Sequence, residues 1–533
     1  MKRGEIAHHV TRGAFFLALE KTAALLTGML YFALMLRWLG PTNYGMLTLA
    51  LAITGLACIA TGNLEVFLER YAAEYQARGR SDLLYRAHAL AVGIKFALGL
   101  LASAALLAVT PHLAIQFKMP ELNVLVPILT VMVATDGLST TGRSLLFGMQ
   151  RFEWVSGLSL LFHAGKTVLV GVLWWSQQGL VSLAIGLTAL AVLQAFMFSA
   201  AAWILARRAA ATAVPAASAA VRAGTSEPAL LLLMVSYCLP LLGARAAFLS
   251  GQNLGKVVLA KVLDATQLGY FTFAFQTIER FVELVYALPS SLLPSLTHLV
   301  AREERERLGY VFDQAFRLVQ VAACVVAWAV FTFAPELTLW VGSPLFLPSM
   351  GMLHVLALVP IARTAQQPLT MLFQAARRPG MVFTLAMLKL GVELTCYLLI
   401  VPRLGGMGAS WANLAGAVTS YLVALVWAGA ILPETRGERA GVFVRALVLT
   451  LPLLALSLLL VREGHAPVLS VLARLALVPP AIVALFALRL VTRYDLEKLS
   501  ALELRAPVVR RVRDAIVGAA DRLAQVFESR RAA

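Results

Sequence analysis

Residues 39–50 read LGPTNYGMLTLA, and residues 263–274 read LDATQLGYFTFA. The two stretches align without a gap at an offset of 224 residues, and each joins two long apolar runs. Five of the twelve aligned positions are identical: Leu39/Leu263, Thr42/Thr266, Gly45/Gly269, Thr48/Thr272 and Ala50/Ala274. The match predicts an internal duplication. The alternative is a chance similarity between two turns rich in Leu, Gly and Thr.

The composition around these stretches is that of a membrane protein. The 533-residue chain is 60% hydrophobic and 14% charged, with a mean hydropathy of +0.80. Soluble domains carry about 25% charged residues, and here apolar runs recur along the whole chain. This excludes a large soluble enzyme and indicates a polytopic membrane protein. The net charge of +17 is typical of cytoplasmic loops rich in Lys and Arg, so we expect no nucleic acid partner.

Fourteen apolar runs reach the length of about 20 residues that a helix needs to cross the hydrocarbon core. The sequence therefore predicts an all-α polytopic membrane protein with about 14 transmembrane helices, in two six-helix lobes plus two extra C-terminal helices. The region 253–266 is ambiguous, since it could extend the seventh span, bend it or form a short surface helix. The predicted spans are 13–38, 44–67, 87–110, 122–149, 153–175, 179–206, 229–252, 267–300, 318–342, 349–376, 381–402, 407–431, 441–461 and 467–490.

The charges between the spans predict the orientation. Lys and Arg gather in alternate connecting segments, which places those segments and both termini in the cytoplasm. Two copies of six spans in the same orientation are expected to be related by an axis along the membrane normal. The predicted domains are an N-lobe with spans 1–6 (1–206), a cytoplasmic linker rich in Ala and Ser (207–228), a C-lobe with spans 7–12 (229–431), spans 13–14 (432–492) and a basic amphipathic cytoplasmic tail (493–533).

The order of elements in the N-terminal part resembles a known family. A basic start and a long first span lead to LRWLGPTNYGMLTLALAITGL (36–56) and then to LERYAAEYQARGR (68–80). This is similar to the Wzx-type polysaccharide flippases of the multidrug/oligosaccharidyl-lipid/polysaccharide exporter superfamily. The LGPxxYG turn at 39–45 is the most recognisable element; its counterpart at 263–269 keeps the glycine and departs elsewhere. The resemblance covers about residues 8–431.

The resemblance implies a fold and a function. It implies a V-shaped cavity between two six-helix lobes. It also implies that an undecaprenyl-pyrophosphate-linked oligosaccharide moves by alternating access from the cytoplasmic to the periplasmic leaflet of the bacterial inner membrane. Such a transporter would serve the biosynthesis of O-antigen, exopolysaccharide or capsule, among membrane lipids and other polysaccharide assembly proteins.

Positive side chains inside the spans are the candidate substrate site. A charge at the bilayer centre costs about 2.5–3.5 kcal/mol on insertion scales, so such groups face a protein interior or an aqueous cavity. A pyrophosphate needs several convergent donors, and guanidinium groups bind it bidentately. The alternative is that these cations form interhelical ion pairs or extend toward the span ends. The candidate cavity-lining cations, drawn from six spans, are Lys21, Lys95, Lys166, Arg245, Arg280 and Arg363.

Acidic side chains in the spans suggest coupling to an H⁺ or Na⁺ gradient, with nothing to separate the two ions. Asp136, in VATDGLSTTGR, has polar neighbours and is the acid most like a cation ligand; Glu65, Glu279 and Glu283 are the other candidates. Lys389 and Glu393 stand at i and i+4 in the eleventh span, which predicts an ion pair.

The sequence lacks the motifs of several other functional classes. The sequence has no GxxxxGK[ST], GxSxG or HExxH, so we expect neither ATP-driven transport nor an enzyme, and no cofactor, metal site or catalytic residue. Three alternatives stay open: a flippase for the peptidoglycan precursor, a cation-coupled multidrug exporter and a scaffold for a polysaccharide assembly complex. A drug exporter for organic cations should have an acidic or aromatic cavity, whereas these deep charges lean positive.

Overall fold

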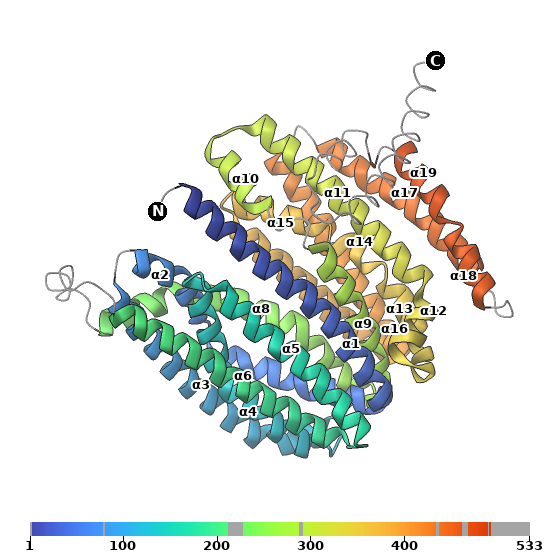
Figure 1. The fold of residues 1–533 in the computed structure, drawn as a ribbon. Helices are drawn as coiled ribbons and strands as arrows, with labels where there is room; N and C mark the ends of the chain where they lie inside the picture. Colours follow the sequence, from blue (N-terminus) through green and yellow to red (C-terminus); the bar gives the residue numbers. More distant parts are fainter. Residues whose placement is uncertain are drawn as a thin grey trace. The chain divides into compact units, whose positions relative to one another are not determined.

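A computed structural model describes the chain over residues 3–77, 80–211, 227–286, 292–432, 436–460, 467–488 and 490–491. The described residues are helical and contain no strand (Figure 1). Nine helices in these ranges are long and apolar enough to cross a membrane. The expectation of an all-α polytopic membrane protein is therefore confirmed, while the number fourteen stays a prediction. Most of the predicted linker, and the whole tail from 493, lie outside the described residues.

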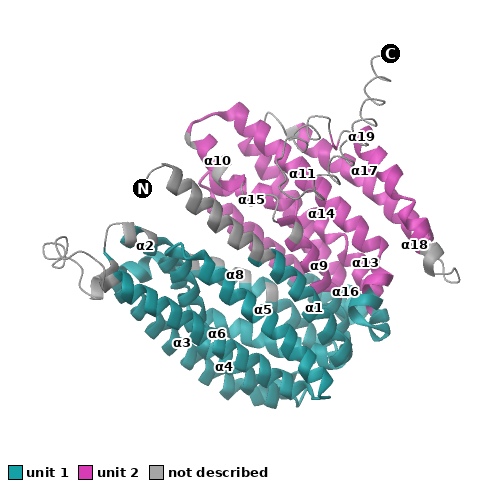
Figure 2. Ribbon diagram, viewed as in Figure 1, with its two compact units in different colours: residues 1–273, 338–348, 394–409 teal, residues 274–337, 349–393, 410–533 magenta. Residues whose placement is uncertain are grey.

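The chain divides into two compact units (Figure 2). Unit 1 comprises residues 1–273, 338–348 and 394–409. Its elements are α1 (Arg3–Ala57), the 3-10 turn η1 (Cys58–Thr61), α2 (Glu65–Ala77), α3 (Ser81–Gln116), α4 (Leu122–Gly148), α5 (Phe152–Trp175), α6 (Leu180–Ala211), α8 (Glu227–Val262), the start of α9 (Ala265–Tyr286), the π-helix η4 (Thr338–Gly342) and most of η5 (Pro344–Ser349).

Unit 2 comprises residues 274–337, 349–393 and 410–533. Helix α16 (Pro379–Ile431) contributes to both units. The other helices of unit 2 are the rest of α9, α10 (Leu292–Ala301), α11 (Arg305–Thr332), α12 (Ala334–Leu337), α13 (Met350–Leu356), α14 (Val359–Arg363), α15 (Gln366–Ala375), α17 (Arg436–Leu460), α18 (Pro467–Leu475) and α19 (Val478–Ala487).

Two long helices each join a pair of predicted spans across a glycine. Gly40 in α1 has φ 68°, and Gly405 in α16 has φ 56°. Positive φ is strained for residues with a Cβ, so glycine supports the break at both places. A proline lies close to each glycine, Pro41 in α1 and Pro402 in α16. The first two predicted spans thus meet at Gly40, and the eleventh and twelfth meet at Gly405.

Other predicted spans are interrupted. The region 253–262, whose structure the sequence left open, continues helix α8. The predicted span 349–376 is divided into α13, α14 and α15, and the predicted span 467–490 into α18 and α19. Both divided spans contain prolines at helix starts, where the missing N–H and the fixed φ are tolerated.

The two matching stretches of the sequence pack against each other inside unit 1. The Thr42 and Thr266 hydroxyls, 224 residues apart, lie 2.8 Å from each other in a hydrogen bond. A Cβ at Gly45 would overlap the carbonyl oxygen of Ala265, and a Cβ at Gly269 would overlap that of Pro41. The residue numbers of Pro41 and Ala265 also differ by 224. Equivalent positions of the two stretches therefore make equivalent contacts with each other. This reciprocity is the signature of a local two-fold relation and favours duplication over chance.

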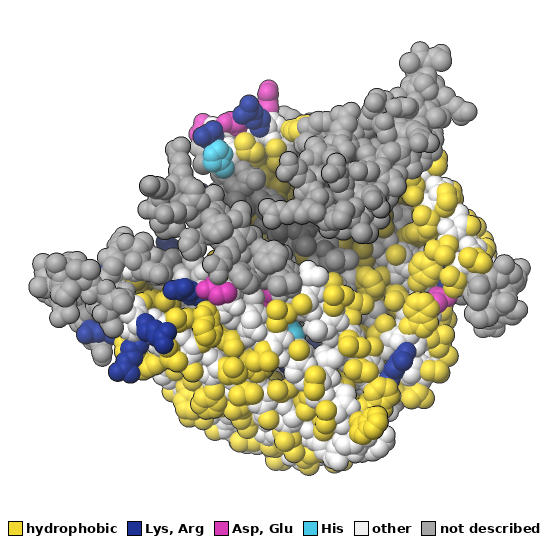
Figure 3. Space-filling model, in the orientation of Figure 1, with side chains coloured by type: hydrophobic (Ala, Val, Ile, Leu, Met, Phe, Trp, Pro, Cys, Tyr) yellow, Lys and Arg dark blue, Asp and Glu magenta, His cyan; other side chains and the backbone are white. Residues whose placement is uncertain are grey.

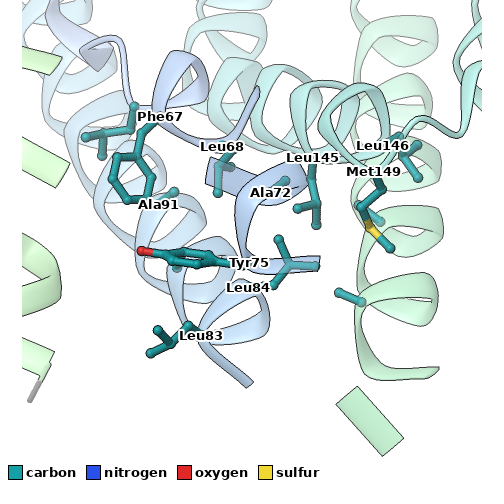
Figure 4. Packing of buried hydrophobic residues seen from close by; sticks show 14 of the residues in the cluster. Phe67, Leu68, Ala72, Tyr75, Leu83, Leu84, Ala91, Leu145, Leu146 and Met149 are labelled. Atoms are coloured by element: carbon teal, nitrogen blue, oxygen red, sulfur yellow. The ribbon is translucent and has the colours of Figure 1, made fainter. Parts of the chain in front are cut away.

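Packing inside unit 1 and its surface follow from the apolar composition. A buried cluster draws Phe67 and Tyr75 from α2, Leu84 from α3 and Leu145 from α4 (Figure 4). On the face drawn in Figure 3, hydrophobic side chains cover most of the visible part of unit 1, and Lys and Arg lie toward its margins. Trp175 is 90% exposed. Such a surface suits contact with lipid, as expected for a multi-pass membrane protein.

We predict that Gly269→Ala lowers the midpoint of thermal unfolding of the purified protein in detergent. The added methyl group overlaps the Pro41 carbonyl, and overpacking of this kind typically costs about 1–3 kcal/mol. Gly157→Ala in α5 is the matched control, because a Cβ there meets nothing within 4 Å. An unfolding midpoint for Gly269→Ala equal to that of the control would contradict this close packing.

Candidate functional site

Four of the predicted site residues come together in unit 1, each from a different helix. Glu65 begins α2, Lys95 lies in α3, Asp136 in α4 and Arg245 in α8. The chain reaches Glu65 through η1 and Gly62, which has φ 82°. A carboxylate in the first turn of a helix is stabilised by the positive end of the helix dipole.

A glycine allows two of these helices to approach. A Cβ at Gly137 would lie 2.6 Å from the Cβ of Lys95. Only glycine therefore fits where α4 passes α3 at this level. The next residue toward the N-terminus, Asp136, is thereby held beside the Lys95 ammonium.

The four charged side chains form one network of ion pairs. The Lys95 Nζ lies 2.6 Å from the Glu65 carboxylate and 3.6 Å from that of Asp136. The Arg245 guanidinium also pairs with Glu65, and its second nitrogen lies 3.6 Å from Asp136. Each cation thus bridges both acids. Two positive and two negative charges cancel, which is the condition for keeping ions away from water.

Neutral polar side chains complete this network. Lys95 donates to the Thr140 hydroxyl at 2.9 Å, Arg245 donates to the Asn63 side-chain oxygen at 3.3 Å, and the Thr61 hydroxyl donates to Asp136 at 3.2 Å. The Lys95 side chain has no exposure, whereas Arg245 and Asp136 keep 16% and 20%. The network is therefore approachable through Arg245 and Asp136, with Lys95 behind them.

Unit 2 holds the predicted residues Arg363 and Glu279 as a bidentate ion pair between α14 and α9; the second of its two contacts is 3.0 Å. The next residue of α9, Arg280, lies 3.5 Å from Glu283, about one turn further on, whose side chain is 57% exposed. The three charges of α9 that stand inside an apolar run are thus each accounted for by a partner.

The predicted i, i+4 pair of the eleventh span is confirmed. The Lys389 Nζ lies 2.7 Å from the Glu393 carboxylate. Sequence reasoning missed that Asn413, twenty residues on in α16, also donates to this carboxylate, at 3.1 Å. It also missed Asn63, although the position of Asn63 between Gly62 and a helix start was a usable signal.

The described members of the six predicted cations are distributed over both units. Lys95 and Arg245 meet in unit 1, Arg363 and Arg280 lie in unit 2, and each of these four pairs with a carboxylate. Lys166 is half-buried on α5, outside the network of unit 1. The side chain of Lys21 lies outside the described part of the chain. Lys95, Arg245, Arg280 and Arg363 thus have carboxylate partners, and a cavity shared by the six cations stays a prediction.

No group of three or more His, Cys, Asp or Glu side chains in the described ranges is arranged to hold a metal ion. The described contacts in the network of unit 1 and in the Arg363–Glu279 pair of unit 2 are ion pairs and hydrogen bonds. A cation in either site can exchange a carboxylate for another anion, and a carboxylate that loses its cation can take up a proton.

Comparison with protein families places the chain. A model described as "Polysaccharide biosynthesis protein" matches residues 10–300, more than half of the chain. The chain belongs to this family. A comparison with curated proteins gave no match.

Solved structures agree on the fold. The chain is similar to an inward-facing multidrug resistance MATE family transporter of the MOP superfamily, with a TM-score of 0.61 and 14% identity over 78% of this chain and 95% of that one. It is also similar to the lipid II flippase MurJ in an inward closed conformation, with a TM-score of 0.61 and 12% identity over 87% and 96% of the two chains. At these identities the likeness concerns the fold alone, which is that of MOP-superfamily transporters.

We predict that Lys95→Met destabilises the protein by about 3–5 kcal/mol, since it leaves an uncompensated negative charge in the buried network. The double variant Lys95→Met/Glu65→Gln restores the charge balance and should recover most of that loss. Thermal unfolding in detergent measures both.

Arg307→Met is the control for the loss of a cation, because its side chain is 78% exposed and pairs with Glu304 at the surface. It should unfold as the wild type does. A double variant no more stable than Lys95→Met would show that charge balance is not what holds the network.

Proposed function

We propose that this protein is a flippase that moves a polyprenyl-pyrophosphate-linked oligosaccharide from the cytoplasmic to the periplasmic leaflet of the bacterial inner membrane. Membership of the polysaccharide biosynthesis protein family is the observation that carries the proposal. A fold shared with a lipid II flippase and with MATE transporters supports movement by alternating access. The distribution of Lys and Arg between the spans supports termini on the cytoplasmic side.

The network of unit 1 supplies a route for recognising the phosphates. Arg245 is its partly exposed cation, and a guanidinium binds phosphate oxygens bidentately. A pyrophosphate would replace Glu65 and Asp136 as the partner of Arg245. Lys95 would then be the one cation left beside both carboxylates, and a proton or a sodium ion would balance the excess negative charge, so that substrate binding is linked to a cation gradient.

Two alternatives share the fold. A flippase for the peptidoglycan precursor is favoured by the similarity to a lipid II flippase, and a multidrug exporter by the similarity to a MATE transporter. The balance of charges in unit 1 removes the argument that its deep charges lean positive. The choice of a glycolipid for surface polysaccharide therefore rests on the family.

Deletion of the gene tests the substrate. We expect a pyrophosphate-linked glycan to accumulate in the cytoplasmic leaflet of the deletion strain, and the wild-type gene to clear it. Arg245→Met should leave at least about tenfold more of this glycan than the wild type, since a bidentate charged contact is worth about 1.5–3 kcal/mol. Arg245→Lys should recover part of the activity.

Arg151→Met is the matched control in unit 1, because the Arg151 side chain is half-exposed and pairs with Glu153 at the surface. It should complement fully. Accumulation of the peptidoglycan precursor, or a fall in dye efflux without accumulation of any lipid-linked glycan, would replace the proposal by the corresponding alternative.

A further inference from the structure

Glu393 in α16 is the most deeply buried carboxylate among the ion pairs of unit 2. Its side chain is 3% exposed, while its partner Lys389, one turn earlier, keeps 24%. The ammonium therefore lies on the outer side of the pair, and the acid lies behind it. Lys389 can swing away along its flexible stem, whereas Glu393 is held in the interior.

Asn413, the second partner of this carboxylate, can form a hydrogen bond with Glu393 whether the acid is ionised or protonated. Asn413 is 4% exposed and donates its side-chain nitrogen to Glu393 Oε1, and its own oxygen Oδ1 is buried with no hydrogen-bond partner. The two ends of an amide are interchanged by a half-turn. With its nitrogen forward, Asn413 donates to an ionised carboxylate; with its oxygen forward, it accepts from a protonated one. The unused acceptor is the group that a protonated Glu393 would need.

The space for this arrangement is built by a glycine. A Cβ at Gly416 would lie 2.6 Å from Glu393 Cγ and 3.1 Å from the Lys389 carbonyl oxygen. Glycine at this position lets the second half of α16 pass directly beside the acid. The site is therefore a fitted pocket for one carboxylate, in which Lys389 and Asn413 both contact the same oxygen, Oε1.

The neighbouring charges decide what happens when Lys389 leaves. Arg363 on α14 and Glu279 on α9 are the charged groups of the packed helices that interact electrostatically with Glu393. They are bound to each other bidentately and cancel. Among the described residues, Lys389 is the cation that forms an ion pair with Glu393. Its departure would leave a net negative charge in the bundle.

We propose that Glu393 is a proton-exchange site, at which the Lys389 ammonium and a proton are alternative partners of one buried carboxylate. When Lys389 moves away it stays an ammonium, a proton from water adds to the carboxylate oxygen, and the Asn413 amide turns to accept the new O–H. When Lys389 returns, the proton leaves to water. The net charge that this pair leaves inside the bundle is zero in both states.

The use of this exchange in transport rests on the proposed function. The anion that draws Lys389 away would be the pyrophosphate of the carried lipid, because an exposed ammonium is a phosphate ligand. One proton would then enter the protein for each substrate headgroup bound through Lys389. The coupling carboxylate of unit 2 would be Glu393, in place of the sequence candidates Glu279 and Glu283.

Infrared difference spectroscopy of the purified protein tests the exchange without any substrate. We expect the carbonyl stretch of a protonated buried carboxylic acid to appear when the wild type is acidified and to be absent from Glu393→Gln. At neutral pH the band should be present in Lys389→Met and missing from wild type and from Lys389→Met/Glu393→Gln. Glu306→Gln, an exposed acid of α11, should behave as wild type. An acid-induced band that survives Glu393→Gln, or no band in Lys389→Met at neutral pH, overturns the proposal.

Proton uptake on addition of inorganic pyrophosphate to the weakly buffered protein tests the link to transport. We expect Glu393→Gln, which should still bind, to take up about one proton fewer per pyrophosphate bound than wild type does. If the infrared result holds but wild type binds no pyrophosphate, the exchange site stands and the proposed substrate fails. If pyrophosphate binds without proton uptake, and its binding requires sodium through Glu393, the site takes a metal cation and the proton assignment is wrong.

Discussion

A charge inside a bilayer must be neutralised where it stands, and this constraint organises the described interior of both units. In unit 1 the Glu65 carboxylate receives both Lys95 and Arg245, and Asp136 lies beside the same two cations. These side chains come from four helices, so the helices cannot shift independently without separating charge in a medium of low dielectric constant. The network therefore fixes helix positions as well as providing an ionic site.

Close backbone approach is the second requirement, and glycine meets it at two of the ion sites. Gly137 lets α4 reach Lys95, and Gly416 gives Glu393 its place within α16. The same device joins the two matching stretches, where Gly45 and Gly269 face backbone carbonyl groups. Ion pairs between helices are short only if the helices are close, and small residues are the usual means of bringing membrane helices together. Packing and electrostatics in this protein are thus set at the same positions.

The sequence predicted what depends on local spacing. Hydropathy predicted the helical membrane fold, and the i, i+4 spacing predicted the Lys389–Glu393 pair. The ungapped match identified two stretches that are in contact in the structure. It could not predict partners that depend on tertiary packing. Arg245 pairs with Glu65 across 180 residues of sequence, and no periodicity along either helix indicates this. The deep cations consequently looked available for substrate, because their counter-ions were distributed over other helices.

Positions 224 residues apart show which residues the two copies share and which differ. It relates the packed glycines, Gly45 and Gly269, and it also relates Lys21 to Arg245. For the rest of the unit 1 network it leads to Pro289, Val319 and Pro360 in place of Glu65, Lys95 and Asp136. The turn is constrained by a contact between the two copies, which neither copy can change alone. The Arg245–Glu65 pair also joins the two copies, but Glu65, Lys95 and Asp136 have no charged equivalents at this offset, so the two halves place charge differently. The described ionic sites are unequal as a result: unit 1 holds four charges in one network, whereas unit 2 holds the pairs Arg363–Glu279 and Lys389–Glu393.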